Sequence, residues 1–162
     1  MSKKKNKAAL SPGKFSPTIA NKKARYNYHL REKLEAGIAL WGTEVKSLRQ
    51  GKASLEEAYC RIRAGELYLV GCTIAAYEHG NRANHEPTRL RKLLVHKREL
   101  LKMETKLTQK GLTLIPVRIY FKRGLAKVEI ALAQGKTHQD KRDKLRDRQA
   151  QREIRQALNR RK

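Results

Sequence analysis

The sequence predicts a mainly β fold: a small closed barrel with short helices and two basic extensions. Three observations predict it. Five or six short segments have the alternation of half-buried strands, one amphipathic helix lies between two hairpin patterns, and both ends of the chain are rich in Lys and Arg with little to bury. We therefore expect an arm over residues 1–18, a barrel domain over 19–133 and a tail over 134–162.

The N-terminal part of the chain contains an arm, a strand and a short helix. Residues 1–18 carry Lys, Ser, Gly and Pro, a composition typical of disorder. The alternation of Tyr26, Tyr28 and Leu30 predicts a strand that starts at Asn21, and an apolar run continues it to Trp41.

Two cap-like signals follow this strand. Thr43 is expected to cap a short helix that ends at Gly51. Ser54 and Glu57 have the spacing of a second short capping box.

A hairpin pattern occupies residues 58–76. Its two arms are 58–64 and 66–76, with the turn at Ala64-Gly65, and Cys60 and Ile62 are predicted to face one side. Residues 77–91 then form a long polar loop, and loops of this length inside a compact domain are often functional.

The remaining elements of the barrel domain are a helix and a second hairpin. Apolar residues repeat at three and four over 92–110, which predicts an amphipathic helix with Gly111 just after its end. Residues 112–122 and 125–133 form a hairpin that turns at Arg123-Gly124. An oligonucleotide-binding-like barrel fits this content, although periodicity does not give the strand order.

The composition indicates an acidic partner. The formal charge is +24 over 162 residues, and no carboxylate precedes Glu32. Such charge attracts nucleic acid through counterion release. We expect no membrane partner, because there is no long apolar run and no signal-peptide pattern.

The two cysteines, Cys60 and Cys72, are too few for a disulfide scaffold and are not at metal-ligand spacing with histidine. We expect buried thiols in a reducing cytoplasm, and neither a metal nor another cofactor.

Three basic clusters are candidates for contact with RNA, and for each the alternative is a solvated surface. They are Asn21, Lys22, Lys23 and Arg25 at the first strand; Lys46, Arg49 and Lys52 around the short helix; and Arg82, Arg89, Arg91, Lys92 and Lys97 in and after the long loop. Among the aromatic residues, Tyr77 is the best candidate for stacking on a base, and most of the others are expected to pack in the core or across strands.

The sequence indicates a binding protein rather than an enzyme. It contains no phosphate-cradling glycine loop and no paired acid and base at a telling spacing. His79 and His85 lie near Glu78 and Glu86, where a general acid or a metal site is conceivable, but a polar loop is the favoured interpretation.

The tail is a helix pattern with almost nothing to bury. From Gly135 to Lys162 it carries eleven Lys and Arg against four Asp and Glu. Its thin apolar stripe, Ala150, Ile154, Ala157 and Leu158, has helical spacing. We expect a tail that is disordered when free, is capped by Asp140 when helical, and folds on an acidic partner.

Several motifs together resemble the SsrA-binding protein family, small protein B. The matching stretches are NKKARYNY, EAGIALWGTEVKSLRQGKASL, PTRLRKLLVHKREL, GLTLIPVRIYFKRGLAKVEIALAQGK and DKR. The resemblance covers about residues 21–142 and extends more loosely to Leu158. It implies a bacterial, cytoplasmic, non-enzymatic protein that binds transfer-messenger RNA (tmRNA) and escorts it to stalled ribosomes in trans-translation.

The resemblance also implies roles for parts of the chain. The barrel would bind the tRNA-like domain of tmRNA near its D-loop, as a monomer on RNA and without DNA as a partner. The tail would enter the 30S decoding centre and the empty mRNA channel as a helix. Family positions tied to RNA binding fall on Asn21, Glu35 and Leu94. The tagging motif falls on Gly135, Lys136, Asp140, Lys141 and Arg142, and a downstream apolar pair on Ala157 and Leu158.

The chain departs from the family pattern at the start of the tail. Thr137 replaces a frequent second Lys, and Gln139 stands where an aromatic residue or His is common, with His138 one place earlier. The sequence leaves open whether His138, Gln139 or neither of them stacks in the decoding centre. The alternatives to the family function are a ribosome-associated chaperone that binds RNA by charge alone and an enzyme acting on RNA.

Overall fold

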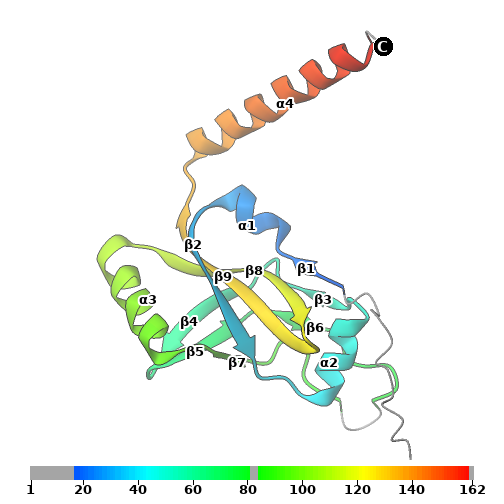
Figure 1. The fold of residues 1–162 in the computed structure, drawn as a ribbon, viewed down its shortest axis with the longest axis vertical. Helices are drawn as coiled ribbons and strands as arrows, with labels where there is room; N and C mark the ends of the chain where they lie inside the picture. Colours follow the sequence, from blue (N-terminus) through cyan, green and yellow to red (C-terminus); the bar gives the residue numbers. More distant parts are fainter. Residues whose placement is uncertain (1–16, 81–83, 161–162) are drawn as a thin grey trace, which may run out of the picture.

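The computed structural model describes residues 17–80 and 84–160. Of the arm expected over 1–18, residues 1–16 lie outside the described residues, and so does Arg82. Figure 1 shows a barrel of strands, with helices α2 (Gly42–Arg49) and α3 (Lys97–Lys110) at opposite ends. A long helix, α4 (His138–Arg160), projects away from the barrel.

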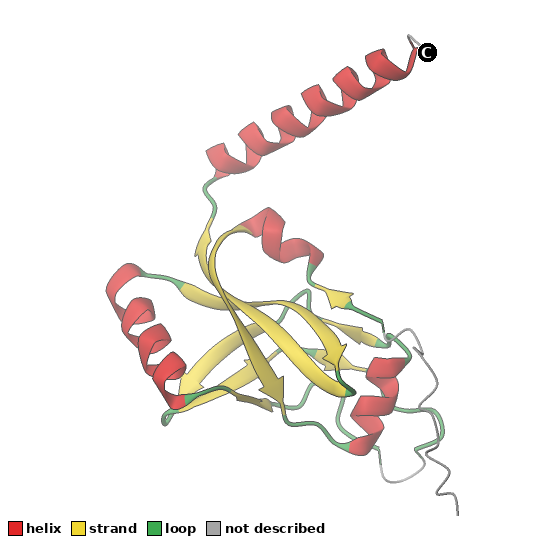
Figure 2. Cartoon of the chain, viewed as in Figure 1, coloured by secondary structure: helices red, strands yellow, loops and turns green. Residues whose placement is uncertain are grey.

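Six strands form a closed ring. They are β2 (Tyr28–Ile38), β4 (Tyr59–Arg63), β5 (Glu66–Val70), β7 (Arg91–Leu94), β8 (Thr113–Lys122) and β9 (Leu125–Gly135). The order around the sheet is β8-β4-β5-β7-β2-β9, and pairing of β9 with β8 closes it. Figure 2 shows this ring in yellow, with the helices outside it. The predicted mainly β closed barrel is confirmed.

Three short strands complete the sheets. β1 (Ile19–Ala20) adds to the outer edge of β8, and β3 (Ala53–Ser54) pairs with β6 (Thr73–Ile74) in a separate ribbon. The ribbon corrects two expectations. Ser54 lies in a strand rather than capping a helix, and the second arm of the first hairpin ends at Val70.

Both predicted hairpin turns are present. Ala64-Gly65 and Arg123-Gly124 have positive φ at both central residues, 49° and 71° in the first turn and 52° and 80° in the second. This geometry matches the right-handed twist of the flanking strands, and Gly adopts it without strain.

The core fills the barrel and extends under two helices. Leu48 anchors α2, and Leu100 and Met103 anchor α3 against the same cluster. The fully buried members that line the interior include Leu67, Leu69, Leu114, Ile119, Val128, Ile130 and Leu132. Cys60 and Cys72 are buried free thiols as expected, and burial raises the pKa of Cys72 to about 11.

The predicted first strand begins with a helix instead. α1 (Lys22–Asn27) precedes β2, which ends at Ile38 rather than Trp41. The Asn21 side chain accepts a hydrogen bond from the Ala24 N–H at 3.0 Å and so caps this helix. The alternation of Tyr26, Tyr28 and Leu30 favoured a strand, although Asn21 is also a common N-cap residue for a helix.

The predicted helix over 92–110 begins too early. Residues Arg91–Leu94 form β7, whose side chains alternate buried and exposed, and α3 starts only at Lys97. β7 is inserted between β5 and β2, so its backbone hydrogen bonds go to the sheet. Helical and strand patterns both fit Leu93 and Leu94, and pairing with the sheet decides between them.

Candidate nucleic-acid interface

Basic side chains gather along α2 and the chain that follows it. Lys46 and Arg49 are one turn apart and exposed, whereas Lys52 is half-buried. The Lys46 ammonium lies 5.2 Å from the centroid of the Tyr77 ring, and the Arg49 guanidinium lies 5.8 Å from that of Phe121. Lys52 pairs with Glu78. Aromatic contacts hold Lys46 and Arg49 while leaving them accessible to phosphate.

The start of α2 differs from the prediction. The helix begins at Gly42, and the Glu44 carboxylate accepts a hydrogen bond from the Trp41 N–H at 2.7 Å. Thr43 is not the cap. Its hydroxyl lies 3.0 Å from Nδ1 of the buried His85, whose Nε2 lies 3.0 Å from the Ile74 carbonyl oxygen. A carbonyl only accepts, so Nε2 carries a proton, and in the neutral imidazole Nδ1 then accepts from the Thr43 hydroxyl.

His85 is therefore a structural residue rather than a general acid. Within residues 17–80 and 84–160, no three His, Cys, Asp or Glu side chains are grouped so that they could hold a metal ion.

Glu44 is a fully buried hub that the sequence analysis missed. Its carboxylate accepts from Arg89 Nε at 2.8 Å and Nη2 at 2.5 Å, and from Arg91 Nε at 2.8 Å. Burial alone would raise the pKa of Glu44, but hydrogen bonds from Arg89, Trp41 and Arg91 outweigh it and hold that pKa below its ordinary value. In the sequence, Glu44 lies three residues after Trp41, which is the spacing between the N-cap and the N3 residue of a capping box.

Arg91, a candidate for RNA contact, is enclosed by the protein. Its side chain is fully buried, and besides Glu44 it donates to the carbonyl oxygens of Cys72, Pro87 and Arg89. Arg91 thus fixes the end of the long loop against the barrel. Arg89 remains partly exposed at the surface.

An apolar groove of about 310 Å³ lies beside α2, which contributes Val45 to its lining. Leu94 is 54% exposed, and its Cβ lies 3.2 Å from where a Cβ on Gly37 would be. The groove is lined by Gly37, Ile38, Leu40, Val45, Leu94, Gly124, Leu125, Ala126 and Lys127. Lys97 is exposed in the first turn of α3, and Lys92 is exposed and paired with Glu66. Leu94 is thus a surface residue rather than core packing.

Glu35 lies in a cluster on the outer face of β2, β8 and β9. Its carboxylate accepts from the Tyr120 hydroxyl and from Lys122 Nζ at 3.0 Å, and it lies 3.8 Å from Lys127 Nζ. The Tyr120 and Lys122 hydrogen bonds lower the pKa of Glu35, and the same carboxylate raises the pKa of Tyr120 to about 12. Glu35 therefore orders the neighbouring Lys122 and the Tyr120 hydroxyl.

Asn21 is buried, and its side chain is fully used inside the protein. Its amide donates to the carbonyl oxygens of Leu55 at 2.8 Å and Pro116 at 3.1 Å, while its oxygen caps α1. These three bonds engage the side chain within the protein. Asn21 instead positions α1, on which Lys22, Lys23 and Arg25 are exposed.

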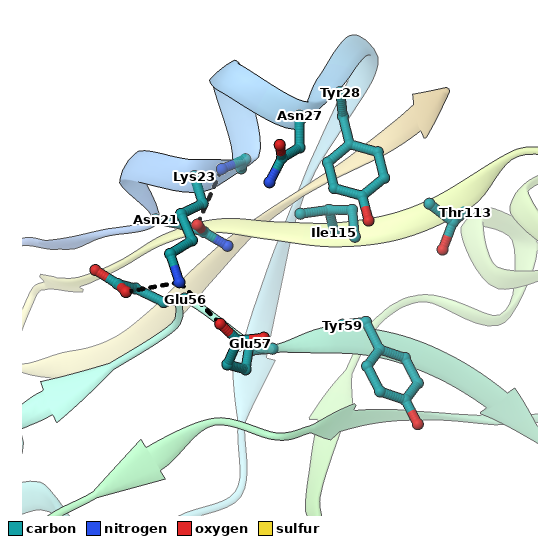
Figure 3. Close-up of a pocket in the computed structure, with 11 residues that line it drawn as sticks. Asn21, Lys23, Asn27, Tyr28, Glu56, Glu57, Tyr59, Thr113 and Ile115 are labelled. Atoms are coloured by element: carbon teal, nitrogen blue, oxygen red, sulfur yellow. Dashed lines mark hydrogen bonds and ion pairs between the residues drawn. The ribbon is translucent and has the colours of Figure 1, made fainter. Parts of the chain in front are cut away.

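A polar hollow of about 410 Å³ lies beneath α1 (Figure 3). Lys23 crosses it and pairs with Glu56 at 3.1 Å and Glu57 at 2.9 Å. Tyr28 and Tyr59 form part of its wall. Lys23 is thus neutralised by two carboxylates and contributes less positive field than its neighbour Lys22.

The tail starts from the barrel at a corner formed with α1. β9 runs to Gly135, opposite Tyr28, and the Lys136 N–H donates to the Asn27 carbonyl at 2.9 Å. β9 therefore ends two residues later than the strand predicted over 125–133. His29 Nε2 lies 3.4 Å from Asp140, and Lys141 lies 5.6 Å from the centroid of the Tyr26 ring.

Thr137, not Asp140, caps α4. The Thr137 N–H and hydroxyl donate to the Asp140 carboxylate at 2.9 and 2.8 Å, and the Asp140 N–H donates back to the hydroxyl at 3.3 Å. This is a reciprocal capping box, and it lowers the pKa of Asp140. His138 is the first helical residue; Gln139 and Arg142 are exposed.

The apolar stripe of α4 faces solvent. Ile154 is 61% and Leu158 63% exposed, and Ala157 is also exposed. In Figure 1 this part of α4 lies well away from the barrel. The thin stripe therefore does not dock on the chain's own core.

None of the helices in the described part of the chain is long and apolar enough to span a membrane.

Comparisons with known proteins agree with this geometry. The family model described as "SmpB protein" matches residues 18–160. The SsrA-binding protein of Desulforudis audaxviator is 56% identical over 85% of this chain and 90% of its own. That of Pelotomaculum thermopropionicum is 53% identical over 87% of this chain and 92% of its own.

A solved structure described as "tmRNA-SmpB: a journey to the center of the bacterial ribosome" is also similar. It is 50% identical, has a TM-score of 0.64, and covers 80% of this chain and 95% of its own. With a family model that matches nearly all of the described residues and relatives at this identity, the chain belongs to the SmpB protein family.

Proposed function

We propose that this protein binds tmRNA and carries it to stalled ribosomes in trans-translation. The barrel binds the tRNA-like domain near its D-loop, and the tail occupies the 30S decoding centre and the empty mRNA channel. In this function the protein acts in the bacterial cytoplasm, as a monomer on RNA, without catalysis and without a cofactor.

The proposal rests on one observation in a chain of this family: the basic barrel and the basic helix α4 are spatially separate. The barrel carries exposed Lys22, Arg25, Lys46, Arg49 and Lys97, and α4 projects from it with its polar and apolar faces both uncovered. This separation suits the proposed function, because the barrel can bind RNA while α4 enters the narrow mRNA channel.

The residues on the barrel divide into two groups. The exposed cations are suited to meet phosphate, and each such contact adds to affinity in a salt-dependent manner. Asn21, Glu35 and Arg91 instead hold other groups in place. Leu94 and its groove offer an apolar surface that a sugar or an unstacked base can cover.

Two experiments test the proposal. The full chain is used to recover RNA from a bacterial lysate, and the bound RNA is sequenced. One structured RNA, recovered in nearly stoichiometric amount, supports the proposal. Many RNAs with a steep salt dependence support binding by charge alone, and turnover of RNA would reveal an enzyme.

The second experiment reconstitutes peptide tagging on stalled ribosomes with tmRNA. Wild-type protein is expected to restore tagging. The test variant changes Lys46 and Arg49 to Ala, and wild-type protein is its reference. These changes remove two exposed cations on α2 and leave the buried Glu44 and its partners intact. This variant should need a higher protein concentration to reach the same tagging.

A further inference from the structure

We propose that Trp41 is a stacking platform for an unpaired RNA base. The inference rests on the proposed RNA binding and adds a specificity-determining residue to it. Trp41 precedes α2 and is 54% exposed, an unusual state for the largest apolar side chain.

The ring of Trp41 is held from one side by a cation. The Arg89 guanidinium carbon lies 4.5 Å from the ring centroid, the shortest such contact among the described residues. At this distance the guanidinium covers one face of the indole. More than half of the side chain nevertheless remains in contact with solvent.

Arg89 is itself fixed, so the platform is pre-organised. Its Nε and Nη2 donate to the fully buried Glu44 carboxylate. Nη1 donates to the Leu90 carbonyl oxygen at 3.2 Å, and Nη2 lies 3.4 Å from the Ala39 carbonyl oxygen. Glu44 also accepts from the Trp41 N–H. The Glu44 carboxylate thus holds both the backbone of Trp41 and the Arg89 guanidinium that faces the Trp41 ring. This pre-organisation reduces the entropy lost when a ligand stacks on the ring.

The surroundings favour a nucleobase as the occupant. Leu40 and Val45, on either side of Trp41 in the chain, line the apolar groove beside Leu94. Exposed Lys46 and Arg49 follow on α2. A flat aromatic face next to phosphate-binding cations is the arrangement with which proteins grip single-stranded RNA, whereas a protein partner with an apolar face would have to desolvate these charges.

The chain offers a direct reporter, because Trp41 is its one tryptophan. We expect intrinsic fluorescence to be quenched and shielded from acrylamide when the full chain binds the tRNA-like domain of tmRNA. Fully paired RNA of the same length should leave the signal nearly unchanged. No change with the tRNA-like domain, under conditions where a gel shift shows binding, overturns the inference.

Variants test whether stacking contributes affinity. Trp41→Leu keeps apolar area but removes the π face, and should weaken binding about 5- to 150-fold, the range for loss of one base–aromatic stack. Trp41→Phe retains a ring and should recover most of the affinity. If it binds no better than Trp41→Leu, the ring contributes no stacking and the inference fails.

Leu145 provides the matched control. It is an apolar side chain that is 51% exposed on α4, outside the barrel, and Leu145→Ala should leave affinity unchanged. An equal loss in both variants would indicate a general loss of structure and would overturn the assignment to Trp41; thermal melts identify such a loss. If wild-type protein fails to shift the tRNA-like domain at all, the proposed function fails instead.

Discussion

At the residue scale, the barrel separates exposed cations from side chains that hold other groups in place. Two carboxylates illustrate this in an otherwise basic protein. Glu44 is buried between Arg89 and Arg91, and Glu35 lies on the surface between Tyr120, Lys122 and Lys127. Both gather donors, so removing either one changes the geometry as well as the charge.

Replacing Glu35 with Ala should weaken tmRNA binding even though the protein becomes more positive. The carboxylate that orders Tyr120 and Lys122 is lost, and their misplacement outweighs the added charge. Binding is measured by titration at several salt concentrations. Glu104→Ala makes the same charge change on the exposed face of α3 and should bind at least as well as wild type. Tighter binding by Glu35→Ala would refute this role.

Tyr120 should lose its proton only at high pH, with a pKa of about 12. The hydrogen bond to the Glu35 carboxylate stabilises the neutral phenol. Because the folded-state pKa is raised, the stabilisation is fully present below the ordinary pKa of about 10 and is lost as pH rises through about 12. Ultraviolet titration of tyrosinate measures it, and Glu35→Gln should return Tyr120 toward its ordinary pKa.

Arg91→Met should destabilise the fold rather than remove a phosphate contact. It leaves the buried Glu44 carboxylate with one arginine fewer, and breaking a buried pair costs about 3–5 kcal/mol. Urea denaturation measures the free energy of unfolding. Lys92→Met, at the next residue, breaks only an exposed pair and should cost less than about 1 kcal/mol. Equal costs would contradict the assignment of Arg91 to the core.

At the element scale, α4 is a long helix with a cap but without a core. The Thr137–Asp140 capping box and the contacts of His29 and Tyr26 hold its first turn. Beyond that turn, Leu145, Ile154 and Leu158 are all at least half exposed. Such a helix depends on its cap and, for most of its length, on a partner.

The tail of the free protein should therefore exchange its amide hydrogens rapidly. We expect residues 143–160 to be weakly protected alone and strongly protected on the ribosome, as measured by hydrogen exchange. Thr137→Ala removes the cap and should reduce helix stability by about 0.5–2 kcal/mol, seen as lower helical circular dichroism. Thr137→Ser keeps the hydroxyl and serves as the control. Strong protection in the free protein would contradict this account.

At the scale of the whole molecule, the barrel and α4 are two separate parts that are joined by the short segment between β9 and α4. The barrel closes through β8 and β9, and the tail leaves after Gly135 on the same side as α1. Since α4 contributes nothing to the core cluster of the barrel, the two functions should be separable.

A chain cut after Lys136 should keep tmRNA affinity and lose peptide tagging. The cut leaves β9 and its pairing with β2 complete, which a cut at Ala133 would not. Gel shift and a tagging assay are the two measurements. Leu158→Asp in the full chain should likewise retain RNA affinity while tagging falls, because burying Leu158 contributes about 1.5–3 kcal/mol at most. Affinity that collapses on truncation would make the tail the RNA-binding element.

The sequence by itself determined the features that depend on local pattern. Both hairpin turns, the end of α3 at Gly111 and the polarity of α4 follow from residue type and spacing, because backbone preference and burial act within a few residues. The family motifs were likewise visible in the sequence.

Only the tertiary structure decided which predicted contact residues are accessible. Arg91 and Arg89 are two positions apart in one basic stretch, yet the first is fully buried and the second reaches the Trp41 ring. The same holds for Asn21, whose partners Leu55 and Pro116 lie far away in the chain. Long-range partners set the burial and bonding of each charge, and a pattern of neighbours along the chain carries no information about them.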